Sequence, residues 1–174
     1  MVTVSAETSL SSSLDDTWAA LGRRATYFYF PGLSPVPAGT GPRPRGVLCH
    51  ALDLPTVDRR EHTAILSVGR TGAKNGRRER CFAVRGDLVS IAGRWQIEPV
   101  DCGVRVRLTL DYEIAPGLKE HAVNTLRSRS PLPIRTDADA ILGRAVDEFF
   151  ETRFTEHAVA YCERLRAQLG GRSA

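Results

Sequence analysis

Hydrophobic and polar residues alternate most regularly in two neighbouring runs near the middle of the chain. From Val104 to Ile114 every second side chain is apolar and the intervening ones are polar or charged, and Leu88–Glu98 follows a similar pattern. A period of two is typical of strands that bury one face and expose the other. The residues between the runs, Pro99–Gly103, include the proline, aspartate and glycine that favour chain reversal. The pattern predicts a long antiparallel hairpin with one apolar face.

Shorter strand-like runs precede this hairpin. They are Thr3–Leu10, Gly46–Leu54, Glu61–Gly69 and Arg77–Arg85, with a further edge strand around Leu33–Val36. Each has the length of an ordinary strand and is bounded by turn residues, and Thr71–Gly76 is expected to be a turn because it ends in the hairpin signal Asn75-Gly76. With the hairpin, these runs predict an antiparallel sheet of six to seven strands.

The strongest helical pattern lies at the C-terminal end. Apolar residues recur at intervals of three and four, acidic residues stand at the start, and Gly170-Gly171 follows the last of them. The pattern predicts a helix of about 30 residues, Asp139–Leu169, with Phe149 and Phe150 on its apolar side. Neither this helix nor the sheet would be soluble alone, so we expect the helix to cover the sheet.

Two further helical segments are indicated. A helix is expected to begin near Leu14, because Ser11–Ser13 can cap it and two aspartates fall in its first turn. Residues Lys119–Arg127 are compatible with a short helix, whereas Ser128–Pro133 is typical of a loop. The whole connection, Leu118–Arg135, is long for a compact domain and is expected to be either disordered or a functional lid.

Length and composition indicate one domain covering residues 1–174. The chain is 42% hydrophobic and 25% charged, which suits a globular domain with a real core. No window approaches the roughly 18 apolar residues of a membrane-spanning helix, and the N-terminus has no basic leader followed by an apolar run. We expect a cytoplasmic protein without stable membrane insertion.

The charge and cysteine patterns exclude several classes of site. The net charge is +4, but the densest basic cluster, Arg77, Arg78 and Arg80, has no interleaved aromatic residues and is interpreted as a solvated turn, so no nucleic-acid partner is expected. The four cysteines lack metal-site spacing, and neither a P-loop nor a dinucleotide-binding pattern occurs. No metal and no cofactor are expected, and the oligomeric state stays open.

The order of these elements resembles a known superfamily. A strand followed by a helix with Trp18 in its first turns, the segment Gly93–Pro99, Tyr112 and the long C-terminal helix are similar to START-like (SRPBCC) proteins, and particularly to their polyketide cyclase/dehydrase and coenzyme-Q-binding branch. The resemblance implies an α+β helix-grip fold, in which a curved antiparallel sheet wraps around the C-terminal helix. The chain departs from the family at Thr17, where an apolar residue is usual, and in the proline-rich stretch Pro31–Pro44.

The resemblance also implies a ligand, since members of the family hold a hydrophobic molecule between sheet and helix. For this chain that would be a polyketide, a lipid or a quinone. Trp95 and Tyr112 are the aromatic wall candidates, and ordinary core packing is the alternative for each. The full set of expected wall residues is Trp95, Leu66, Leu110, Phe149 and Phe150.

Three polar side chains are the candidates for chemistry. Arg70 follows Ser67-Val68-Gly69, which is similar to the position of an inward arginine in aromatase/cyclase members of the family. A guanidinium there would stabilise an enolate or a carboxylate. His62 shares a strand face with Arg70 by parity and would move a proton, and Tyr112 would polarise the ligand. The alternatives are an exposed arginine at a strand end and a half-buried histidine with ordinary partners.

Three functions are compatible with these patterns. The first is a polyketide cyclase or aromatase in which the pocket imposes a conformation on a reactive chain. The second is a carrier without chemistry, for a lipid or quinone, or a sequestering self-resistance protein of the enediyne type. The third is a protein-interaction domain resembling the co-chaperone branch of the superfamily.

Replacing Arg70 by alanine tests the first function. If the guanidinium makes a buried, charge-assisted contact, the variant should bind an anionic or enolisable ligand more weakly by about 1–3 kcal/mol. Its melting temperature should change little. Calorimetric titration beside thermal unfolding measures both, and unchanged affinity would remove Arg70 from the site.

Overall fold

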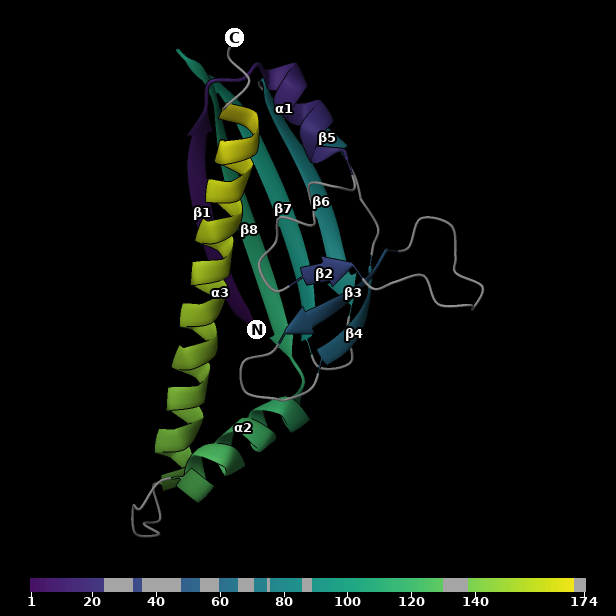
Figure 1. The fold of residues 1–174 in the computed structure, drawn as a ribbon. Helices are drawn as coiled ribbons and strands as arrows, with labels where there is room; N and C mark the ends of the chain where they lie inside the picture. The colour runs from purple at the N-terminus through teal and green to yellow at the C-terminus, as the bar shows by residue number, and fades with distance from the viewer. Residues whose placement is uncertain are drawn as a thin grey trace, which may run out of the picture.

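The computed structural model describes residues 1–23, 33–35, 48–53, 60–65, 71–74, 76–85, 89–129 and 138–170 of the chain (Figure 1). Side chains are described for residues 1–23, 76–83, 89–128 and 140–169. These parts form one antiparallel sheet, a shorter helix at each end of it, and a long helix across one of its faces. The chain therefore has the α+β architecture that the hydrophobic pattern predicts.

Four long strands make up the body of the sheet. They are β1 (Val2–Leu10), β6 (Arg77–Arg85), β7 (Val89–Val100) and β8 (Gly103–Ile114). Four short strands extend it: β2 (Leu33–Pro35), β3 (Leu48–Asp53), β4 (Arg60–Ile65) and β5 (Thr71–Lys74). The order is β1-β8-β7-β6-β4-β3-β2, with β5 paired to β6. All these pairs are antiparallel.

The predicted hairpin is the centre of this sheet. β7 and β8 pair without interruption from Val89 opposite Ile114 to Val100 opposite Gly103. Gly103 has φ +131°, and a Cβ there would meet the backbone carbonyl of Leu10. Only glycine combines this conformation with so close an approach to β1. The hairpin tip is thus held against the end of the first strand.

The expected number of strands was wrong. The described residues form an eight-stranded sheet rather than one of six to seven strands. The additional strand is β5, in a segment whose sequence predicts a turn: Thr71–Lys74 pair antiparallel with Arg77–Arg80 of β6. The first four residues of that segment therefore belong to the sheet. Leu66–Gly69, predicted as the end of a strand, lies outside the described residues.

Two helices begin with clear N-terminal signals. α1 (Leu14–Leu21) starts after Ser13, whose Oγ accepts a hydrogen bond from the backbone N–H of Asp16 at 3.1 Å. Thr17, which departs from the family pattern, is fully buried, with its Oγ1 2.7 Å from the hydroxyl of Ser12. α2 (Pro116–Arg129) is longer than the predicted Lys119–Arg127, because Pro116 fits the first turn of a helix, where its missing N–H costs nothing.

The long helix α3 (Ala138–Gly170) has 33 residues and lies lengthwise against the sheet beside β1 and β8 (Figure 1). The side chains that it buries recur every three or four residues and are Val146, Phe150, Phe154, Ala158, Tyr161, Cys162 and Leu165. Ala158 has no exposed surface, so its small side chain lets the helix backbone approach the sheet closely. The prediction that the C-terminal helix covers one face of the sheet is confirmed.

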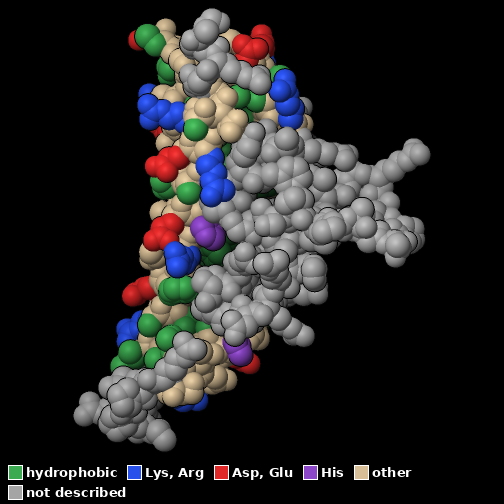
Figure 2. Space-filling view, in the orientation of Figure 1, with side chains coloured by type: hydrophobic (Ala, Val, Ile, Leu, Met, Phe, Trp, Pro, Cys, Tyr) green, Lys and Arg blue, Asp and Glu red, His purple; other side chains and the backbone are tan. Residues whose placement is uncertain are grey.

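The outer face of α3 is mixed in character. Figure 2 shows acidic and basic side chains interspersed along it, with hydrophobic ones between them. Phe149 lies there, 36% exposed, whereas Phe150 is 1% exposed. The prediction that both pack on the apolar side was therefore wrong for Phe149, because successive residues on a helix point about 100° apart. Within the ranges given above, no helix is long and apolar enough to cross a membrane.

A substitution at Gly93 in β7 tests how tightly the side chains at the centre of the sheet are packed. A Cβ at this position would fall inside the ring of Phe82 on the neighbouring strand. We expect Gly93→Ala to lower the free energy of unfolding by about 1–3 kcal/mol, the usual cost of overpacking a core, as measured by denaturant unfolding.

Gly143→Ala is the matched control. It lies in α3, and a Cβ added there would have nothing within 4 Å of it. This variant should stabilise the protein by about 0.5–1 kcal/mol because alanine favours helix. Equal stability of Gly93→Ala and the wild type would show that the Phe82 ring does not occupy this space.

Candidate functional site

The candidate site lies on the face of the sheet that α3 covers. Alternate residues of β7 and β8 point to this face and are buried, as their hydrophobic pattern predicts. Trp95 and Leu110 have no exposed surface and Tyr112 is 1% exposed. The predicted orientation of these three side chains toward the interior is confirmed, and Phe150 of α3 joins them in the same hydrophobic core.

Tyr112 is an aromatic wall with an unused hydroxyl. Its ring stacks on that of Phe154, with centroids 3.6 Å apart and planes 5° apart. Its Oη is buried and has no hydrogen-bond partner among the described residues. Burial raises the pKa of the Tyr112 phenol well above its ordinary value. At neutral pH this group is therefore a hydrogen-bond donor and not a base.

Trp95 has the same character. Its ring meets Tyr161 of α3 edge to face at 5.1 Å between centroids and lies 6.4 Å from the ring of Phe82. The indole Nε1 is buried and without a partner in the part of the chain that the structure describes. An indole nitrogen can only donate. Trp95 and Tyr112 thus present two N–H or O–H groups with no acceptor among the described residues.

The pairing register gives the backbone separation of these two residues along the sheet. Trp95 lies opposite Leu108 on β8, and Tyr112 is four residues further along that strand. Four residues of a strand span roughly 13 Å. Trp95 therefore lies midway along the hairpin and Tyr112 near the end of β8, with Leu110 between the two positions.

Arg80 is an interior residue that the sequence pattern did not reveal. It pairs with Trp95 across β6 and β7 and is 8% exposed. Its guanidinium carbon lies 4.2 Å from the centroid of the Trp18 ring, and Nη1 lies against Gly22. Nε and Nη1 are buried without a hydrogen-bond partner among the described residues. The interpretation of the arginine cluster as a solvated turn is thus wrong for Arg80.

The neighbouring arginines confirm that position within the strand decides their role. Arg78 shares the face of Arg80, bonds Asp15 at 2.6 Å and lies 5.8 Å from the Trp18 ring. Arg77 points to the other face and pairs with Glu98 at 2.8 Å. The signal that would have identified Arg80 was its parity with Phe82, an apolar residue two positions further along.

The remaining predicted site residues fall outside what the structure describes. His62 lies in β4 opposite Ala51, and its side chain is not described. Arg70 and Leu66 are outside the described residues altogether. Their assignment to the site, and the chemistry assigned to Arg70 and His62, stay predictions.

One described histidine lies near the interior. His157 is half-buried on α3, three residues after Phe154 and four before Tyr161, and so on the side of the helix that packs on the sheet. Burial, and then the Arg153 cation, lowers the pKa of the His157 imidazole. A neutral imidazole can accept a proton.

The thiols show no sign of redox or metal chemistry in the part of the chain that is described. Cys81, Cys102 and Cys162 are free. Burial, and then the Glu163 carboxylate, raises the pKa of the Cys162 thiol to about 12, which makes it unreactive. No group of three potential metal ligands occurs among the residues with described positions.

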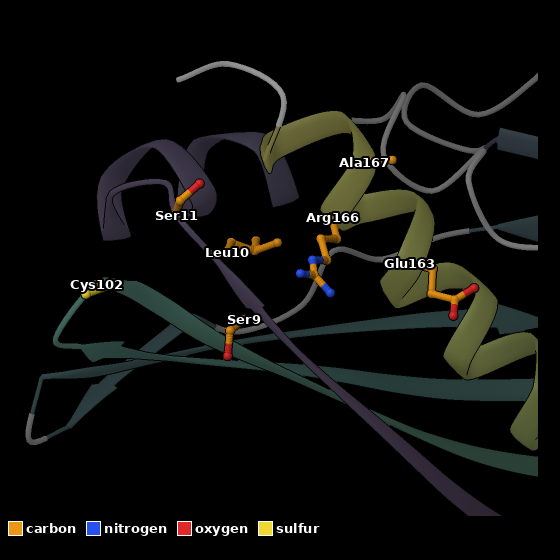
Figure 3. A pocket seen from close by; sticks show the side chains of 7 residues that line it. All are labelled: Ser9, Leu10, Ser11, Cys102, Glu163, Arg166 and Ala167. Atoms are coloured by element: carbon orange, nitrogen blue, oxygen red, sulfur yellow. The ribbon is translucent and has the colours of Figure 1, made fainter. Parts of the chain in front are cut away.

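A surface groove of about 570 Å³ lies at one end of the sheet, between β1, the hairpin tip and the C-terminal part of α3 (Figure 3). Its lining comprises Ser9, Leu10, Ser11, Cys102, Glu163, Arg166 and Ala167. A second hollow of about 320 Å³ shares Ser9 and Arg166 with it. Neither is lined by Trp95, Tyr112 or Arg80, so both are separate from the interior face.

Comparison with known proteins supports the fold. No family model and no curated protein matches the chain. Among solved structures, TTHA0849 from Thermus thermophilus is 15% identical over 99% of both chains, with a TM-score of 0.58. CV1439 from Chromobacterium violaceum is 11% identical over 98% of this chain and 99% of that chain, with a TM-score of 0.52.

A START superfamily protein from Mycobacterium smegmatis also matches, at 18% identity over 84% of this chain and 98% of that chain, but its TM-score of 0.45 is too low to support a conclusion. The order of elements in the structure itself is strand, helix, antiparallel sheet and long covering helix. The chain shares the fold of TTHA0849 and CV1439, and the long helix lying over one face of its antiparallel sheet is the helix-grip arrangement that the sequence pattern predicts.

The Tyr112 hydroxyl gives a prediction for alkaline pH. Its pKa is raised from 10.0 in the folded protein, so above about pH 10 the unfolded chain releases a proton that the folded chain keeps, and stability falls as pH rises. We expect the free energy of unfolding of Tyr112→Phe to fall less steeply than that of the wild type.

At neutral pH the same variant should be as stable as the wild type or up to about 1 kcal/mol more stable, because it removes an unpaired buried hydroxyl. Denaturant unfolding from pH 7 to 11 measures both effects. Cys162 is present in both proteins and cancels in the difference. A loss above about 1 kcal/mol at neutral pH would show that the hydroxyl has a partner within the protein.

Proposed function

We propose that this chain binds a largely apolar, elongated small molecule of the aromatic or polyketide-like class between the sheet and α3. The observation that supports this most directly is the presence of buried donors on Trp95 and Tyr112 without acceptors among the described residues. Buried polar groups in proteins are almost always hydrogen-bonded, because leaving one unpaired costs about 1–3 kcal/mol. A ligand oxygen at each donor would remove that cost.

The surroundings of the donors define the body of this ligand. Leu110, Phe150 and Phe154 are buried hydrophobic residues on the same face or against it. With donors roughly 13 Å apart along the strands, an apolar molecule that carries an acceptor oxygen toward each end fits best. A poly-β-ketone or an aromatic product formed from one has this form. Leu66 is retained as a proposed wall residue, whereas the exposed Phe149 is not.

Catalysis as a polyketide cyclase or aromatase is the more specific form of this proposal. Trp95 and Tyr112 would hold carbonyl oxygens and polarise them, and Tyr112 would give up its proton only to a developing oxyanion. Cyclisation also needs a group that removes a proton from carbon. His62 is the residue proposed from the sequence, with Arg70 stabilising the enolate, and His157 is the described imidazole on the covering helix.

A carrier without chemistry is the second candidate. It is favoured by the donor character of Trp95 and Tyr112, which suits holding a molecule more than abstracting a proton from it. A lipid or quinone carrier and a sequestering self-resistance protein would both use the same space. A protein-interaction domain would need no ligand there.

A neutral dye with one ketone provides the test. We expect prodan, an aromatic ketone, to bind the wild type with one-to-one stoichiometry and blue-shifted emission. Prodan has one ketone, and Trp95 and Tyr112 are roughly 13 Å apart along the strands, so one of Tyr112→Phe and Trp95→Phe should weaken this binding by about fivefold to tenfold through loss of a hydrogen bond of about 1–1.5 kcal/mol, while the other should change it by less than about twofold. Thr109→Val is the matched control, because it removes a hydroxyl from β8 on the opposite face of the sheet.

Native mass spectrometry of the protein purified from its host would identify the natural ligand. Conversion of the extracted molecule by fresh protein would establish a cyclase, and its return unchanged a carrier. Failure of prodan to bind, together with an empty protein from the host, would contradict ligand binding and leave the interaction domain.

A further inference from the structure

We propose that Arg80 binds an anionic group of the ligand, so that the molecule held by this fold is an acid. This inference rests on the proposed function and adds the charge of the ligand to it. The guanidinium is 8% exposed, and two of its three nitrogens, Nε and Nη1, have no hydrogen-bond partner among the described residues. Arginine stays protonated in proteins, so this is a buried positive charge.

No protein anion compensates this charge in the part of the structure that is described. The inward side chains of β6, β7 and β8 include no carboxylate, and the acidic residues of these strands alternate onto the opposite face. Of the two acids on α1, Asp15 is bound by Arg78 and is 83% exposed, and Asp16 is exposed and accepts a hydrogen bond from the Ser13 hydroxyl. A buried charge without a counter-charge is strongly unfavourable, and the Trp18 ring at 4.2 Å offsets only part of that cost.

The position of Arg80 connects it to the proposed ligand. It lies directly opposite Trp95 on the neighbouring strand, and both side chains face the interior. The indole and the guanidinium therefore project from paired positions of neighbouring strands, while Tyr112 lies four residues beyond the partner of Trp95 on β8. A carboxylate or another anion accepts several such bonds at once, and bonds to a charged acceptor are the stronger ones.

The neighbours of Arg80 hold its side chain in place without any ligand. The Trp18 ring covers the guanidinium, and Gly22 leaves free the space that Nη1 occupies. The alternative is a purely structural role, in which the cation stabilises the C-terminal end of α1 through its carbonyl groups. The two roles differ in whether the charge selects a ligand.

A pair of dyes that differ mainly in charge separates them. Anilinonaphthalene sulfonate carries one negative charge, and phenylnaphthylamine has nearly the same rings without it. We expect the wild type to bind the anionic dye at least about tenfold more tightly than the neutral one. Arg80→Met should lose this preference while it binds the neutral dye within about twofold of the wild type.

Two further variants complete the experiment. Arg78→Met is the matched control, since it removes a cation two residues away on the same strand face, and it should keep the preference. Arg80→Lys retains the charge and should keep part of the preference. This variant also provides the test if Arg80→Met does not fold.

Sodium sulfate added to the wild type distinguishes the ligand's own anion from any inorganic anion. We expect sulfate to raise the melting temperature far less than the anionic dye does.

The outcomes distinguish the two proposals. If neither dye binds the wild type, the proposed ligand site itself is wrong. If both dyes bind and Arg80→Met preserves the full preference of the wild type, the ligand site stands and the anion site is overturned. Equal loss of both dyes in Arg80→Met, with a lower melting temperature and no recovery of preference in Arg80→Lys, would assign Arg80 the structural role.

Discussion

The structure depends on the mutual burial of two apolar surfaces, one face of the β7–β8 hairpin and one side of α3. Each large side chain buried between them contributes about 1.5–3 kcal/mol, and the largest fully buried ones, Trp95, Tyr112, Tyr161 and Phe150, all lie in this interface. The aromatic pairs Tyr112–Phe154 and Trp95–Tyr161 join helix to sheet directly. The remaining strands extend a sheet that this contact already holds in place.

The same contact has a consequence for polar atoms. A well-packed interface can tolerate a tyrosine or tryptophan without a partner only at the cost of its hydrogen bond, and a phenylalanine in place of Tyr112 would fill nearly the same space without that cost. Two donors and a guanidinium nevertheless occupy the covered face. Packing alone would be served better by apolar side chains, and the proposed function gives these polar groups a ligand to bind.

The apolar residues of this protein make the fold, and the few polar groups that face the interior are what distinguishes it from other proteins with the same fold. The helix-grip arrangement provides walls and an enclosed position, and two of the solved structures that share the fold are 11–15% identical to it, which is too distant to transfer an activity. What remains specific to this chain is the arrangement of donors: Arg80 with Trp95 near α1, and Tyr112 roughly 13 Å away.

The sequence by itself determined the hairpin, the covering helix and the inward orientation of Trp95, Leu110 and Tyr112, because these follow from periods of two and 3.6 residues that each element must obey alone. Only the tertiary structure decided the burial of Arg80, since an arginine on a strand face is exposed or covered according to whether another element packs over it. Here α1 brings Trp18 onto that face. In the same way, β5 became a strand because β6 lay alongside it, and Phe150 rather than Phe149 entered the core because the direction from which the helix meets the sheet selects one of two neighbours. The periodicity of the sequence within one element indicates which residues share a face. Only packing between distant segments decides which face is buried.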